Sequence, residues 1–153
     1  MILSLRIIKD HFFLGGGANN FAYYLRDYVT AEMHGYWIRT VHNQYLLVWA
    51  ENGLIGLGAY LWFLFTTLRM GWQAWQQKHD RVLAVITLGA TASLFAAVFH
   101  MTGEKYHARV QVEMVFLMAG LVTAVYRLWA TEQNATLLLA AHQNSQHQNG
   151  IRL

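Results

Sequence analysis

Three long stretches without charge constrain the fold of this chain more than any other feature. Residues 52–68 and 82–103 contain no Asp, Glu, Lys or Arg, and residues 110–126 contain only Glu113. A helix that crosses the hydrocarbon core of a bilayer needs about 20 mostly apolar residues. Charged residues make up 12% of the chain, about half the usual share in soluble domains. We therefore predict an all-α, polytopic membrane protein with three transmembrane helices.

The predicted spans divide the chain into three regions. Residues 1–43 are expected to form a periplasmic segment with short helices, interrupted by the glycine-rich stretch 14–21. Residues 44–130 contain the spans, predicted at about 44–70, 82–101 and 110–128. Residues 131–153 form a polar tail, expected to be a weak helix followed by disorder. The Lys and Arg distribution slightly favours a cytoplasmic loop 69–81 and tail, so that residue 42 and loop 102–109 face outward.

Composition and spacing exclude several kinds of site. There are no cysteines, so disulfides and thiolate metal sites are ruled out. The net charge is +3 and the basic residues are scattered, which argues against nucleic acid as a partner. His100, Glu104 and His107 have the spacing of metal ligands on a helix, but Gly103 and the expected turn interrupt that helix. We expect neither a metal nor a cofactor.

Small residues recur along the second predicted span. Gly89, Ser93 and Ala97 follow one another at intervals of four residues. Small side chains at this spacing let helix backbones approach closely in a membrane. This stripe is therefore expected to pack against another helix.

A histidine–asparagine pair stands at the entrance of the first predicted span. The pattern reads His42-Asn43-x-Tyr45-Leu46 and continues as Glu51-x-Gly53-Leu54-x-Gly56-Leu57. Together with the upstream stretch "IIKDHFFLGGGANNF", it resembles the O-antigen ligase and polymerase superfamily of bacterial inner-membrane glycosyltransferases. The resemblance covers residues 1–130 and departs from the family at Phe12, where proline is common.

The resemblance implies transfer of a glycan from a polyprenyl-diphosphate-linked donor to an acceptor hydroxyl. The acceptor would be lipid A-core, in lipopolysaccharide biosynthesis, or a growing glycan if the protein is an O-antigen or exopolysaccharide polymerase. It also implies a multi-pass protein of the bacterial inner membrane, in contact with membrane lipids. Superfamily members have many more spans than three, so the chain is expected to be the C-terminal part of a longer protein. The missing N-terminal helices would then be its partners, and the chain alone would be inactive.

His42 is the expected catalytic base. It precedes a helix N-terminus, whose dipole disfavours the imidazolium, and a base must carry a neutral ring. The alternative is an interfacial histidine that caps the helix, and the resemblance favours the base. Arg39 suits a phosphate oxygen because arginine binds phosphate through a planar fork, or it extends to the interface as a lipid-facing arginine. Arg26 is a weaker substrate-binding candidate because its neighbour Asp27 indicates a solvated face.

Further residues around the motif are expected to bind substrate or to support the site. Asn43 would orient His42 or, more in keeping with the residue type, cap the helix. Tyr45 would line a groove for the isoprenyl tail or pack against a neighbouring helix. Glu51, Gly53 and Gly56 are expected to be structural, with Glu51 bonding backbone groups freed near Gly53.

Two other functional classes remain as alternatives. A transporter should show polar breaks near the midplane of its helices. The midplane stretches 60–64, 91–95 and 117–121 are mostly apolar, which weighs against a transporter. The chain could also be a non-catalytic remnant that folds only beside other helices.

Overall fold

The computed structural model describes residues 2–28, 41–76, 81–103 and 109–151 of the chain. Every element in these ranges is a helix, which confirms the all-α prediction. The helices are α1 (Ile2–Asp10), α2 (Phe21–Tyr28), α3 (Gln44–Gln76), α4 (Arg81–His100) and α5 (Arg109–Ile151).

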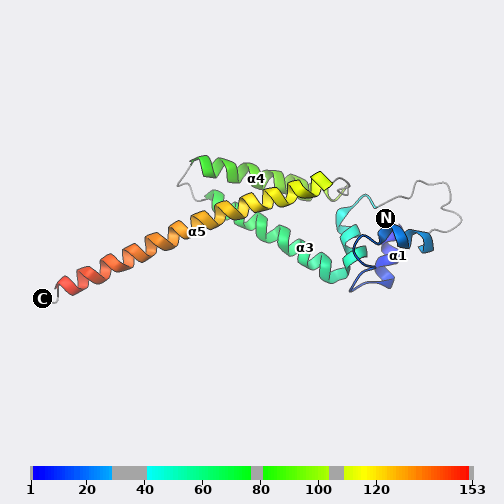
Figure 1. Ribbon diagram of the computed structural model, residues 1–153, viewed down its shortest axis with the longest axis horizontal. Coiled ribbons are helices and arrows are strands. Elements are labelled where there is room, and N and C mark those ends of the chain that lie inside the picture. The colour runs from blue at the N-terminus through cyan, green and yellow to red at the C-terminus, as the bar shows by residue number, and fades with distance from the viewer. Residues whose placement is uncertain (1, 29–40, 77–80, 104–108, 152–153) are drawn as a thin grey trace.

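The three long helices α3, α4 and α5 lie against one another, and the short helices gather at the beginning of α3 (Figure 1). The contact between the long helices is a small apolar core formed by Leu64, Leu94, Met101 and Val115. All three helices are long and apolar enough to cross a membrane. The chain is therefore a polytopic membrane protein, with three candidate membrane-spanning helices among the residues that the structure describes.

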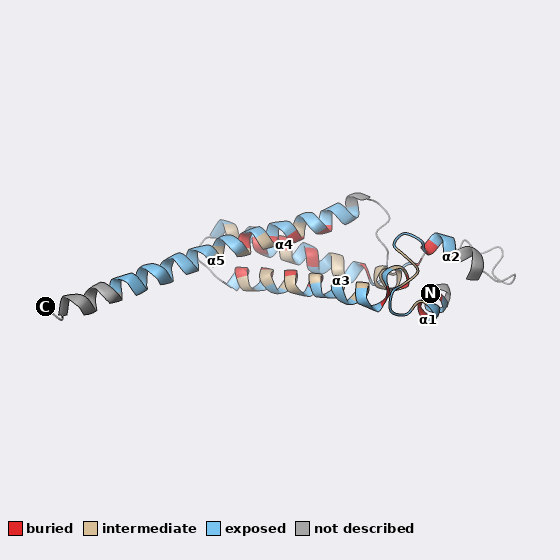
Figure 2. Cartoon of the chain, turned by 60° about the horizontal axis from the view of Figure 1, so that its bottom comes forward, coloured by how far each residue is buried: buried red, intermediate tan, exposed pale blue. Residues whose placement is uncertain are grey.

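The outer faces of the long helices carry large apolar side chains. Trp62 of α3, Phe95 of α4 and Phe116 of α5 are 68%, 63% and 57% exposed. Figure 2 shows few buried residues on these helices and long exposed faces. Such faces suit lipid, because hydrocarbon solvates apolar side chains as well as a protein core does.

The N-terminal segment forms a separate apolar cluster on the first turns of α3. Ile7 and Ile8 of α1, Phe21 of α2, and Val41 and Ala50 are buried together. Leu46, Leu47 and Trp49 pack against this cluster. The short helices α1 and α2 are thereby attached to the entrance of the first span.

The helix α5 continues well beyond the predicted third span. It has 43 residues and is therefore about 64 Å long, roughly twice the thickness of a bilayer core. The sequence predicted a weak helix followed by disorder for the tail, whereas the structure keeps the tail helical to Ile151. The stretch 131–149 has no proline or glycine, and extending an existing helix avoids the cost of nucleation.

Of the small-residue stripe on α4, Ala97 alone packs against the apolar core between the long helices. No atom lies within 4 Å of the position of a Cβ built on Gly89, and Ser93 is exposed. The close approach occurs at Gly71 of α3, where an added Cβ would collide with the Thr91 side chain of α4. Packing therefore uses a neighbouring face of α4, which includes Thr87, Ala90 and Leu94.

Candidate functional site

His42 lies two residues before Gln44, the first residue of α3, and its side chain is exposed. The preceding residue, Val41, is only 2% exposed and belongs to the N-terminal cluster. The exposed histidine therefore directly follows a residue that is buried in the N-terminal cluster.

Asn43 is the N-cap of α3. Its Oδ1 accepts a hydrogen bond from the Leu46 N–H at 2.9 Å, and its carbonyl accepts the Leu47 N–H at 3.1 Å. This geometry satisfies one of the helix donors that lack an intrahelical partner. Capping, the use expected from the residue type, is present in the structure.

The beginning of α3 is also bonded to the end of α4. The Asn43 Nδ2 donates to the Thr102 carbonyl at 2.8 Å, and the Gln44 N–H donates to the Met101 carbonyl at 2.9 Å. The Tyr45 hydroxyl donates to the Val98 carbonyl at 2.7 Å. Of the two uses expected for Tyr45, contact with a neighbouring helix is the one that the structure contains.

The helix α3 is interrupted at Gly53. This residue has φ 68° and ψ −171°, which is not a helical conformation. The backbone region is one that essentially only glycine occupies. The interruption separates a short entrance piece, which begins at Gln44, from a longer apolar piece that ends at Gln76.

The loop that follows α1 supplies hydrogen-bond partners for the interrupted helix. The Gly16 and Gly17 N–H groups donate to the Ala50 and Glu51 carbonyls, each at 2.8 Å. On the other side of the break, the Leu54 N–H donates to the Phe12 carbonyl at 2.9 Å. The Ile55 N–H donates to the Phe13 carbonyl at 3.5 Å.

These four bonds replace two bonds of a regular helix. In a continuous helix the Leu54 and Ile55 N–H groups would bond the Ala50 and Glu51 carbonyls. The loop 12–17 instead accepts from both donors and donates to both acceptors. We call this arrangement the loop–helix clasp.

Two glycines make the close approach in the clasp possible. A Cβ on Gly53 would collide with the Phe13 carbonyl, and a Cβ on Gly15 would collide with the Glu51 carbonyl. Gly15 also has a positive φ of 74°. The sequence indicated a turn in this stretch but not its partner, because nothing local connects residue 15 with residue 53.

The side chain of Glu51 reaches α2. Its Oε1 accepts the N–H of Phe21, the first residue of α2, at 3.3 Å. A carboxylate is favourable at a helix N-terminus. Glu51 was expected to bond groups near Gly53, and the bond in the structure goes to Phe21 instead. At Gly56 an added Cβ would collide with the Asn52 Cβ, so this glycine makes room for a side chain across the break.

The break in α3 differs from the broken helices of transporters. In those proteins the unwound backbone lines a binding site for a substrate or ion. Here the backbone groups freed at Gly53 are bonded to the loop 12–17 of the same chain. The interruption anchors the loop on α3 and provides no support for the transporter alternative.

Several predicted residues lie outside what the structure describes. Arg39 is among the undescribed residues, and Arg26 belongs to α2 but its side chain is not described. Glu104 and His107 are also undescribed. Since α4 ends at His100, the three residues with metal-ligand spacing do not share one helix. Within the described ranges, no three His, Asp or Glu side chains form a cluster suited to a metal ion.

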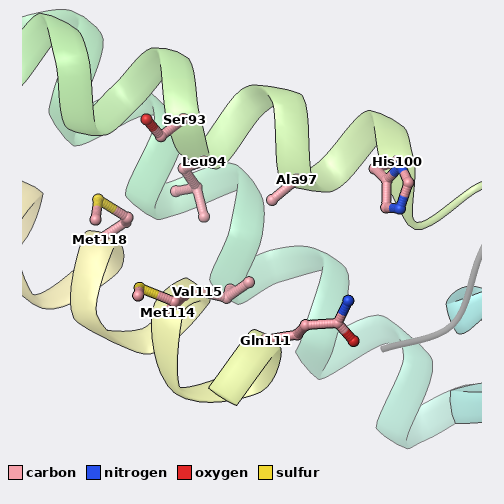
Figure 3. A pocket seen from close by; sticks show the side chains of 8 residues that line it. All are labelled: Ser93, Leu94, Ala97, His100, Gln111, Met114, Val115 and Met118. Carbon is pink, nitrogen blue, oxygen red and sulfur yellow. The ribbon is translucent and has the colours of Figure 1, made fainter. Parts of the chain in front are cut away.

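A pocket of about 390 Å³ lies between α4 and α5 (Figure 3). His100 and Gln111 lie toward one end of it, and Ser93 and apolar side chains line the remainder (Figure 3). The lining residues are Ser93, Leu94, Ala97, His100, Gln111, Met114, Val115 and Met118. The sequence analysis did not anticipate this pocket, although Met114 and Met118 at a spacing of four place two flexible side chains on one face of α5.

The fold and the clasp define an all-α membrane protein whose first span carries an anchored glycine-rich loop at its entrance. Residues 2–61 match the family model of O-antigen ligase, which confirms the resemblance over this segment. The matched segment contains α1, α2, the clasp and His42. Residues 62–130, to which the sequence resemblance extended, lie outside the match. Among curated proteins and among solved structures, none matches this chain.

Proposed function

We propose that this chain is part of an enzyme that transfers a glycan from a polyprenyl-diphosphate donor to an acceptor hydroxyl, as an O-antigen ligase does. The observation that carries the proposal is the family match over residues 2–61, which includes His42 at the entrance of a membrane span. In this proposal the membrane is the bacterial inner membrane, and residues 1–43 lie on its periplasmic side.

His42 is the proposed general base of this reaction. Diphosphate is already a good leaving group, so the site must mainly remove a proton from the acceptor hydroxyl as that oxygen attacks the sugar. The exposed position of the His42 side chain supports this role, because an acceptor can reach it from outside the chain.

Arg39 and Arg26 are the proposed phosphate ligands from this part of the protein. Charge on the departing diphosphate must be stabilised by fixed cations, and arginine offers a planar fork of donors. Asn43 and Tyr45 were considered for substrate binding, but their polar atoms bond α3 and α4 in the structure. We therefore propose the two arginines as the substrate-binding residues of the segment. The reaction proposed here uses no metal and no cofactor.

The experiment is substitution of His42 in the complete protein that contains this chain. His42→Ala and His42→Gln are expected to reduce glycan transfer by at least about 100-fold, the usual range for loss of a general base. His142→Ala, an exposed histidine on the distal part of α5, is the matched control and should transfer normally. Membrane levels of all variants are compared by immunoblot. Normal transfer by both His42 variants would refute the base assignment.

The acceptor separates a ligase from a polymerase, since both use the same donor. Purified complete protein is given a lipid-linked glycan with either lipid A-core or a second lipid-linked glycan. Product on lipid A-core supports the ligase that the family match favours. Extension of the lipid-linked glycan alone would reassign the protein as a polymerase.

A further inference from the structure

We propose that Asn43 and Tyr45 are positioning residues that hold His42 in place by bonding the start of α3 to the end of α4. This inference rests on the proposed function, because it concerns how the proposed base is held. In this proposal Asn43 and Tyr45 affect the reaction by keeping His42 in position, and neither residue contacts the substrate.

The end of α4 has backbone carbonyls that its own helix does not use. Within α4 and the turn after it, the Ala97, Phe99 and His100 carbonyls accept N–H groups of residues 101–103 at 3.0 to 3.1 Å. The remaining carbonyls in this stretch belong to Val98, Met101 and Thr102. Each of these three accepts a hydrogen bond from residues 43–45.

The beginning of α3 thus serves as the cap of α4. Three successive residues, Asn43, Gln44 and Tyr45, donate to α4 or its following turn. The donors at a helix N-terminus and the acceptors at a helix C-terminus carry opposite partial charges, so this arrangement is electrostatically favourable. Near lipid these groups have few other partners, which makes the bonds costly to break.

His42 is fixed from both sides of its backbone. Val41 is buried in the cluster formed with α1 and α2, and Asn43 is bonded to the end of α4. The exposed imidazole therefore projects from a point where the N-terminal cluster and the three-helix bundle meet. A base must lie within hydrogen-bond reach of the proton that it removes. Displacement of the His42 backbone should therefore move the imidazole and slow the chemical step.

The oxygen and the nitrogen of the Asn43 side-chain amide make different hydrogen bonds, and these can be tested separately. Its Oδ1 caps α3, and its Nδ2 bonds Thr102. Serine is as good an N-cap as asparagine but lacks the amide donor, whereas alanine lacks both functions. Comparison of Asn43→Ser with Asn43→Ala therefore distinguishes the bond to α4 from the cap.

The kinetic experiment uses the complete protein and varies the concentration of the lipid-diphosphate donor. Asn43→Ser and Tyr45→Phe should each reduce kcat by about 10- to 100-fold, the effect of a small misplacement of a catalytic group. KM should change little, because neither residue touches the donor. Tyr126→Phe, which removes a hydroxyl from the body of α5, is the control and should behave as the unaltered protein.

Two kinetic outcomes would overturn the proposal. A raised KM with unchanged kcat would show that Asn43 or Tyr45 binds substrate directly. Normal kinetics of Asn43→Ser beside an impaired Asn43→Ala would show that only the cap matters.

A second measurement does not depend on activity. These 153 residues contain no cysteine, and any native cysteines in the rest of the complete protein would first be replaced, so a disulfide can form only between His42→Cys and Gly103→Cys. Disulfide formation in membranes should be several-fold slower when Asn43→Ser or Tyr45→Phe is added. An unchanged rate would refute the positioning role, even if the His42 variants were inactive. Active His42 variants with a slowed crosslinking rate would reject the proposed base and leave the geometric inference standing.

Discussion

Gly53 combines a glycine-only backbone conformation with close contact to another part of the chain. Its φ of 68° would strain any side chain, and a Cβ would also meet the Phe13 carbonyl. Gly15 has the same two properties, with the Glu51 carbonyl as the obstacle. The clasp therefore depends on two glycines that are far apart in the sequence.

Substitution of Gly53 by alanine should destabilise the protein. The backbone conformation alone costs a non-glycine residue about 1–3 kcal/mol, and relief of the collision would break clasp hydrogen bonds. Gly58→Ala is the matched control, because Gly58 lies in the helical part of α3 and has no atom within 4 Å of an added Cβ. The measurement is the melting temperature in detergent and the amount of protein in the membrane. Equal stability of the two variants would contradict the clasp.

For single residues, the sequence predicted hydrogen bonds to nearby backbone groups but not hydrogen bonds to residues far away in the chain. The residue type of Asn43 indicated a cap, and the cap is present. The second bond, from Asn43 to Thr102, joins residues 59 positions apart and leaves no local signature. For the same reason Glu51 was assigned a nearby partner, whereas it bonds Phe21.

Among the elements, hydropathy identified the helices better than it identified their ends. The uncharged stretches correspond to α3, α4 and α5, because length and apolarity alone decide whether a helix can cross a bilayer. Backbone groups freed near Gly53 were expected, but the non-helical conformation of this residue was not, because glycine is also common inside membrane helices. The tail was predicted to be a weak helix followed by disorder, and its last part was assigned wrongly because its polar composition resembles that of disordered segments.

The antiparallel course of the helices leads to a topology prediction. The start of α3 is bonded to the end of α4, so Gly103 lies on the same side as His42, and Gln76 lies at the other end of α3. In the complete protein, any native cysteines of the remaining sequence would first be replaced. Gln76→Cys and Gly103→Cys should then react with an impermeant maleimide from opposite sides of the membrane.

Labelling of intact cells should modify position 103 and spare position 76, if residues 1–43 are periplasmic as proposed. Permeabilised cells should show labelling at both positions, which serves as the control. Labelling of both positions from one side would contradict three membrane-crossing helices.

At the scale of the whole molecule, the described residues form two apolar clusters, and the long helices have extended exposed faces. The cluster around Ile7 and the cluster around Leu94 are joined at the beginning of α3, where Tyr45 packs against the second and Leu46 against the first. Three helices of this kind leave apolar side chains such as Trp62 and Phe99 uncovered. An enclosed, water-poor site for a lipid diphosphate would need additional walls.

The 153-residue chain alone is therefore expected to be inactive in glycan transfer. Stabilisation of a departing diphosphate requires fixed cations in a site shielded from water. In residues 2–28, the basic side chains that the structure describes are Arg6 and Lys9, and both are exposed. The chain would be expressed alone and together with the proposed N-terminal helices, and transfer to lipid A-core would be assayed. Transfer by the chain alone would reject the proposal that it is part of a larger enzyme.

The clasp also has a consequence for how the protein is made. The backbone groups around Gly53 find their partners in residues 12–17, which leave the ribosome before α3 does. Without the loop in place, those groups would be unpaired near lipid, at a cost of several kcal/mol each. Because the loop has already been synthesised when α3 emerges, the break can be closed as soon as the span inserts, whereas a protein without this loop would be left with an unfinished first span.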